Sequence, residues 1–100
     1  MADHKYAYTL GGVAGIGEHM LQGIADAVRA GQLDRRRIVA SFEEILCRAG
    51  ICIADSGDSQ LCSRALLRLR RRGFCHYSRR SKIYEFWEWR LPGYVKRDGN

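Results

Sequence analysis

The sequence has no apolar run that approaches the roughly 20 residues a helix needs to cross a bilayer. Its first residues, Met1 to Lys5, are polar and lead into no long apolar stretch, so we expect no secretory signal. These two absences predict a cytoplasmic protein that does not use a membrane as a partner. In that compartment thiols stay reduced, and disulfides are not expected.

The four cysteines lack the short C-x-x-C spacing that structural zinc sites usually present. We therefore expect no metal, although His76 next to Cys75 keeps a metal site open as an alternative. The simpler interpretation treats the thiols as small buried hydrophobic groups. This applies to Cys47, Cys52, Cys62 and Cys75.

Catalytic and cofactor-binding patterns are also missing. His4, His19 and His76 are scattered and stand in no arrangement with a nucleophile and an acid. The glycine-rich stretch 9–17 looks like a dinucleotide-binding turn, but no second parallel strand follows to place an acid on the ribose. We expect no enzyme and no cofactor, and interpret these glycines as a flexible segment before the first helix.

The composition is that of one small globular domain. The chain has 100 residues, of which 46% are hydrophobic and 28% charged. We expect a single domain over residues 1–95, and a frayed tail at 96–100 after Pro92-Gly93.

The positive charge is confined to one half of the chain. Residues 1–50 carry six basic and six acidic residues, whereas residues 51–100 carry eleven and five, which accounts for the net charge of +6. A localised positive field attracts polyanions, chiefly nucleic acid, and secondarily acidic protein surfaces. The alternative is a basic face kept for solubility.

Hydrophobic periodicity predicts an α+β fold of three helices followed by a two-stranded antiparallel hairpin. A β-prone run at Lys5–Leu10 favours a short N-terminal strand. The expected helices run from Ile16 to about Gly31, from an Asp34 cap to about Gly50, and over about 59–72. The hairpin is expected from Phe74–Tyr77 and Ile83–Trp89, joined by Ser78–Lys82.

The third helix divides into an apolar and a basic side. At 100° per residue, one side gathers Leu61, Cys62, Ala65, Leu66 and Leu69, which predicts the core-facing surface. The other side gathers Gln60, Ser63, Arg64, Leu67 and Arg71, flanked by Arg68 and Arg70. Arginines three and four apart repel one another when no acid lies between them, and a polyanionic partner would relieve that repulsion.

Each of these side chains suits a role on nucleic acid. Arg64 and Arg71 suit guanine edges or phosphates, and Gln60 suits adenine. The sugar-phosphate backbone of the nucleic acid is the expected target of Arg68, Arg70 and Arg72. Ser63 is expected to complete the exposed face. The hairpin tip is expected to reach the flanking phosphates or the minor groove of the nucleic acid, through Arg79, Arg80 and Lys82.

Residues Ser41–Trp87 resemble the winged-helix variant of the helix-turn-helix. Phe42–Ile51 looks like a positioning helix with its turn, and Ser59–Phe74 like a recognition helix that runs into the first wing strand. The resemblance implies a transcriptional regulator that reads duplex DNA, and a homodimer. The turn from Gly50 to Asp58 is longer than the usual three or four residues, which leaves the angle between the two helices open.

Two other functions use the same surface. A small inhibitor or adaptor protein would place the basic face on an acidic protein groove, with Leu67 as an apolar anchor. RNA binding would combine the arginine helix with aromatic residues of the last strand. On that strand Trp87 and Trp89 share one face, and Tyr84 and Phe86 point the other way. The Trp87/Trp89 face, the first helix or the N-terminal strand would supply a dimer contact.

Overall fold

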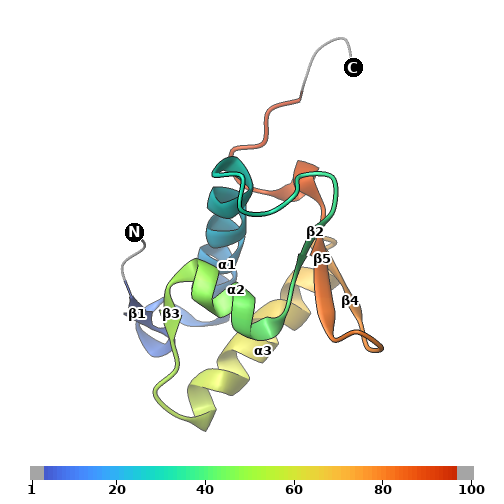
Figure 1. Ribbon diagram of the computed structural model, residues 1–100. Coiled ribbons are helices and arrows are strands. Elements are labelled where there is room, and N and C mark those ends of the chain that lie inside the picture. Colours follow the sequence, from blue (N-terminus) through green and yellow to red (C-terminus); the bar gives the residue numbers. More distant parts are fainter. Residues whose placement is uncertain (1–3, 97–100) are drawn as a thin grey trace.

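The computed structural model describes residues 4–96, which form an α+β fold of three helices and a small antiparallel sheet (Figure 1). In chain order the elements are β1 (Lys5–Tyr6), a 3₁₀ helix (Ala7–Thr9), α1 (Gly12–Arg29), β2 (Ile38–Ala40), α2 (Phe42–Ala49), β3 (Ile51–Cys52), α3 (Ser56–Arg71), β4 (Cys75–Ser78), β5 (Ile83–Phe86) and a second 3₁₀ helix (Glu88–Arg90). The predicted fold class and the β4–β5 hairpin are confirmed. The predicted order is wrong in detail, because two strands lie between the helices.

Helix α1 is the element on which the other two helices pack. Its side chains Ile16, Met20 and Ile24 are completely buried. The glycine-rich stretch is not a flexible segment before this helix, because α1 begins at Gly12 and includes Gly15 and Gly17. A Cβ on Gly15 would overlap the carbonyl of Leu10, so close chain packing explains that glycine.

The segment predicted as the first part of the second helix is instead strand β2. Ile38 and Ala40 are buried on one side and Val39 is half-buried on the other, which is the alternation of a strand. Helix α2 begins only after Ser41, whose hydroxyl accepts a hydrogen bond from the Glu44 N–H at 3.2 Å. The proposed cap Asp34 accepts from the Arg36 N–H in a turn before β2.

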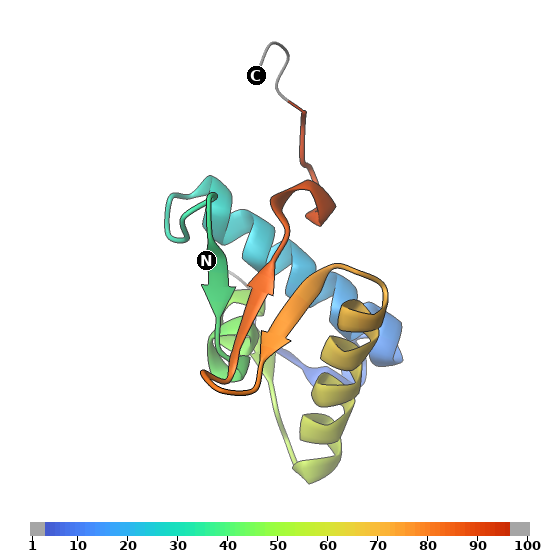
Figure 2. The same ribbon diagram turned by 90° about the vertical axis from the view of Figure 1, so that its right-hand side faces the viewer.

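Strand β2 adds a third strand to the hairpin, so the sheet order is β2-β5-β4 (Figure 2). Ile38, Phe86 and Cys75 lie in register across the three strands, and all three are buried against the helices. The next row along the sheet, Val39, Glu85 and His76, therefore faces away from the core.

The long connection between α2 and α3 has a structural explanation. Its residues Ile51 and Cys52 form β3, which pairs in parallel with β1. The Lys5 N–H also donates to the Gly50 carbonyl at 2.8 Å. The nine residues that made the turn look too long therefore contain a strand, and the N-terminal segment holds it in place.

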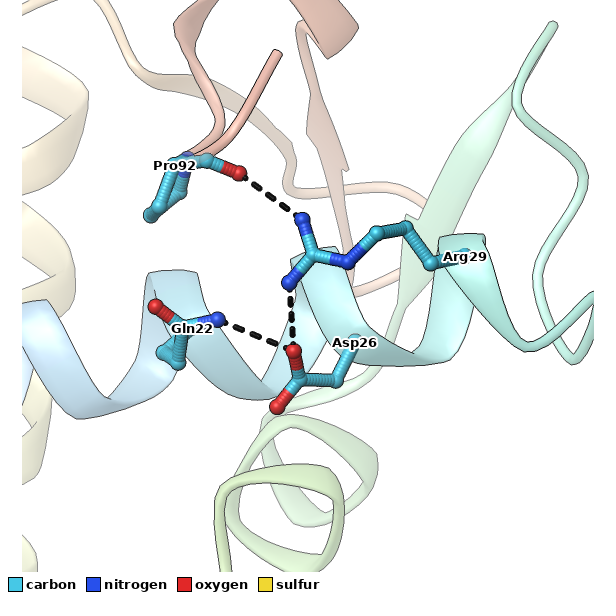
Figure 3. A network of polar contacts seen from close by, with 4 residues as sticks. All are labelled: Gln22, Asp26, Arg29 and Pro92. Carbon is cyan, nitrogen blue, oxygen red and sulfur yellow. Dashed lines mark hydrogen bonds and ion pairs between the residues drawn. The ribbon is translucent and has the colours of Figure 1, made fainter.

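The C-terminal segment turns away from the sheet sooner than expected. Strand β5 ends at Phe86 rather than Trp89, and Glu88–Arg90 form a 3₁₀ helix. Leu91 is buried, and Arg29 of α1 holds the next residue by donating to the Pro92 carbonyl at 3.2 Å (Figure 3). The same guanidinium contacts Asp26 at 2.6 Å. The predicted frayed tail 96–100 lies, apart from Lys96, outside the described residues.

Across residues 4–96, no helix combines the length and the apolar character that crossing a bilayer requires.

Two glycines of α1 are expected to respond in opposite ways to alanine. A Cβ on Gly23 would lie 2.6 Å from the Ala49 Cα, so Gly23→Ala should destabilise the protein by about 1–3 kcal/mol through overpacking of α1 on α2. A Cβ on Gly17 would meet only the Leu69 side chain at an ordinary 3.5 Å. Gly17→Ala should therefore be neutral or stabilise the helix by up to about 1 kcal/mol. Urea denaturation of both variants measures the difference, and equal destabilisation would contradict this packing.

Candidate nucleic-acid interface

Helix α3 has the predicted rotation about its own axis. Cys62, Ala65, Leu66 and Leu69 are buried, and Leu61 is half-buried at the border. The exposed side chains are those predicted to face outward, namely Gln60, Ser63, Arg64, Leu67, Arg68 and Arg71, followed by Arg72 at the end of the helix. We call Arg64, Arg68, Arg71 and Arg72 the basic face.

No carboxylate neutralises the basic face within the described part of the chain. The three ion pairs found over residues 4–96 are Arg29–Asp26, Arg35–Glu88 and Arg36–Asp34, none of which involves α3 or the hairpin turn. The exposed guanidinium groups therefore repel one another across neighbouring turns of the helix without relief. This is the electrostatic arrangement that a polyanion would stabilise.

Arg70 differs from its neighbours because it is half-buried against the hairpin. Its guanidinium carbon lies 5.2 Å from the centroid of the Tyr77 ring on β4. That ring contacts Tyr84 across the hairpin, with 4.6 Å between centroids. Arg70 is half-buried and joins α3 to the hairpin, which gives it a structural role besides the predicted contact with the nucleic-acid backbone.

The basic tip of the hairpin is an exposed four-residue turn between β4 and β5. Arg79, Arg80 and Lys82 are all exposed, and the Lys82 N–H closes the turn by donating to the Ser78 carbonyl at 2.7 Å. Lys82 has a φ of 57°, a conformation that is uncommon outside glycine.

Helix α3 and the hairpin tip meet at one shallow hollow. Ser63 and Lys82 line it together, and its volume is about 290 Å³; the other lining residues are Phe42, Glu43, Tyr77 and Tyr84. Arg68 lies about 140° around the helix from Ser63, so it belongs to the flank away from this hollow. The candidate residues thus form a band that wraps around α3 rather than a single line.

The N-terminal end of α3 is acidic, because Asp55 and Asp58 lie there. The helix begins at Ser56 instead of near residue 59, and Asp55 caps it by accepting from the Asp58 N–H at 3.0 Å. The buried Asp58 carboxylate in turn accepts from the Ala54 N–H at 2.8 Å. The basic face is therefore limited to the C-terminal half of α3, where the helix dipole favours cations.

Arg90 is a further basic residue at the C-terminal end of α3. Its guanidinium donates to the Arg72 carbonyl at 2.8 Å and lies 4.2 Å from the centroid of the Phe74 ring. It connects the second 3₁₀ helix to the end of α3. The contact spans 18 positions of sequence, so no local pattern predicted it.

Two buried thiols lie under this surface. Burial raises the pKa of Cys75 to about 11, although the nearby Arg70 guanidinium acts in the opposite direction. Burial also raises the pKa of Cys62, and the Asp58 carboxylate adds to that effect. Over residues 4–96, no three His, Cys, Asp or Glu side chains converge as a metal site would need.

Comparison with family models, with curated proteins and with solved structures found no match for this chain.

The interpretation of all four cysteines as buried groups is wrong for the exposed Cys47 and only partly right for the half-buried Cys52, so the four free thiols should differ strongly in reactivity. Cys47 is exposed, so it should react first with a disulfide reagent at pH 8, and the half-exposed Cys52 should follow. A raised pKa leaves less thiolate at that pH, so Cys62 and Cys75 should react only on unfolding. Mass spectrometry of peptides after timed quenching measures the order. Modification of Cys75 as fast as Cys47 in the folded protein would contradict the burial described above.

Proposed function

We propose that this protein binds nucleic acid, and that its partner is duplex DNA. The observation that carries the proposal is the uncompensated basic face of α3, together with a hairpin turn that carries three further cations and meets α3 at Ser63. In this proposal α3 enters the major groove, whose width suits a helix, and the hairpin turn contacts the flanking phosphates. The chain would then act as a winged-helix transcriptional regulator.

The arrangement of elements supports the winged-helix resemblance. Helices α2 and α3 are consecutive, α3 runs directly into β4, and β2 completes a sheet with the hairpin. Arg70 and the Tyr77 ring hold the hairpin against α3, so the turn and the helix are presented together. A partner therefore meets a preformed surface, which lowers the cost of binding.

The spacing along α3 suits a short DNA site. Gln60, Arg64 and Arg71 point outward, and the rise of a helix separates the first from the last by about 16 Å. Along an inclined major groove this length brings side chains to several neighbouring base pairs. Because Asp55 and Asp58 stand at the N-terminal end, we place the closest phosphate contacts around the C-terminal half.

One observation favours a second candidate function. Leu67 lies in the middle of the exposed side of α3 and is 37% exposed. An apolar side chain surrounded by arginines is a suitable anchor on an acidic protein groove, which is the chemistry of an inhibitor or adaptor. On DNA the same residue would contact a thymine methyl group.

Removing arginines from α3 should weaken duplex binding. Arg71→Ala should lower affinity for duplex DNA and reduce the slope of log affinity against log salt by about one if it contacts a phosphate. Arg64→Ala should cost about 1–3 kcal/mol and relax sequence preference if it reads a base. Fluorescence anisotropy with labelled duplexes at several salt concentrations measures both.

Arg48→Ala is the matched control. Arg48 lies on α2 and donates to Gln32 at 2.6 Å, so the variant loses the same charge away from the basic face. It should retain the affinity and salt slope of the wild type. An equal loss in Arg48→Ala and Arg71→Ala would point to net charge alone, and absence of duplex binding at moderate salt would overturn the proposal.

Removing an acid near the hairpin should have the opposite effect. Glu43 lines the hollow between Ser63 and Lys82, where its carboxylate repels a phosphate. Glu43→Gln should therefore tighten duplex binding several-fold, chiefly at low salt, because screening weakens the repulsion at high salt. The same anisotropy titration tests this, with Glu18→Gln on the exposed side of α1 as the control. Unchanged affinity in Glu43→Gln would place the duplex elsewhere.

A further inference from the structure

Two tryptophans form a stacked pair immediately after β5. The Trp87 and Trp89 rings have centroids 5.6 Å apart and are inclined by only 13°. Trp87 is half-buried, whereas Trp89 is 63% exposed and is the outer member of the pair. Neither ring lies in the core cluster, so the folding of the domain does not explain why so much aromatic surface is presented to solvent.

Polar groups of complementary kinds surround this pair. Trp87 and Trp89 line a second hollow of about 290 Å³ together with Arg35, Arg36 and Glu85. Arg35 is engaged by Glu88 at 3.0 Å, but Arg36 is 91% exposed and reaches Asp34 only at 3.7 Å. The hollow therefore offers a flat aromatic surface, a hydrogen-bond acceptor at Glu85 and a guanidinium group that solvent reaches freely.

The pair is braced on two sides. The Arg35–Glu88 ion pair fixes one end of the 3₁₀ helix Glu88–Arg90 to the segment before β2. At the other end Arg90 donates to the Arg72 carbonyl at the end of α3. Arg90, which follows Trp89 in the chain, therefore ties this 3₁₀ helix to the C-terminal end of α3 at Arg72, one of the residues of the basic face.

We propose that Trp89 stacks an unpaired nucleobase of a bound nucleic-acid strand, with Arg36 on a phosphate and Glu85 accepting a hydrogen bond from the base. Stacking on an exposed indole suits every base, with the larger ring system of a purine covering more of it, and the Glu85 acceptor suits an amino or ring N–H of the unpaired base. This inference rests on the proposed function, because the strand reaches Trp89 from a duplex held on the basic face. The preferred ligand is then a duplex with a single-stranded extension.

The chain reports on this site directly, because Trp87 and Trp89 are its two tryptophans. The probes are a 16-base-pair blunt DNA duplex and the same duplex with a three-nucleotide 3′ adenine overhang, or a thymine overhang. We expect the adenine overhang to bind at least about fivefold more tightly than the blunt end and to quench tryptophan fluorescence. The thymine overhang should gain less, because thymine presents a smaller ring system than adenine to Trp89 and offers Glu85 only its N3–H.

Trp89→Ala should remove the advantage of the overhang and leave the affinity for the blunt duplex within about twofold. The matched control is Tyr8→Ala, since Tyr6 and Tyr8 form another exposed stacked pair. Strand β1, which contains Tyr6, lies on the opposite side of the molecule from the hairpin (Figure 1). This variant should keep the advantage. In Trp87→Phe the single remaining indole, Trp89, should still be quenched by the adenine overhang.

The outcomes separate the two proposals. Equal affinity for blunt and overhang duplexes in the wild type, without quenching, overturns the stacking site and leaves duplex binding intact. An overhang advantage that survives Trp89→Ala overturns the role of Trp89. Failure to bind either duplex at moderate salt overturns both proposals.

Discussion

The burial of one side of helix α3 fixes the direction of every charged group on its other side. Cys62, Ala65, Leu66 and Leu69 are enclosed by the core, and rotating the helix would expose them while burying arginines. Burying a guanidinium group without a partner costs far more than the fold of a small domain can supply. The basic face is therefore a consequence of core packing, which fixes the side of the molecule from which its arginines emerge.

The rest of the candidate surface is attached to α3 by contacts at its two ends. At the N-terminal end, Asp55 and Asp58 fix the start of the helix and place negative charge there. Toward the C-terminal end, Arg70 packs on the hairpin through Tyr77, and Arg90 holds the 3₁₀ helix that carries Trp89. Two arginines thus serve the architecture, while none of the ion pairs found over residues 4–96 engages the other arginines of α3 and the hairpin turn. Charge count alone does not separate these roles.

The sequence predicted the parts of the fold that depend on local periodicity and missed those that depend on distant contacts. The rotation of α3 and the β4–β5 hairpin followed from the 3.6-residue and 2-residue periods. Ile38 and Val39 fit the apolar stripe of a helix as well as they fit a strand, and it is the pairing of this segment with β5 that makes it a strand. The same limit applies to the site. The exposure of Arg64 followed from the helical period, but the contact of Arg90 with α3 joins residues 18 positions apart in the sequence, which no local pattern predicts.

The central claim is that the basic face of α3 contacts duplex DNA, and two-dimensional NMR of the arginine Nε–Hε groups tests it most directly. On titration with a duplex at about 100 mM salt, the account predicts shifts for Arg64, Arg68 and Arg71. It predicts no change for Arg29, which Asp26 and Pro92 hold near the C-terminal end of α1. Shifts at Arg29 with unchanged α3 signals, or no shifts at all, would contradict it.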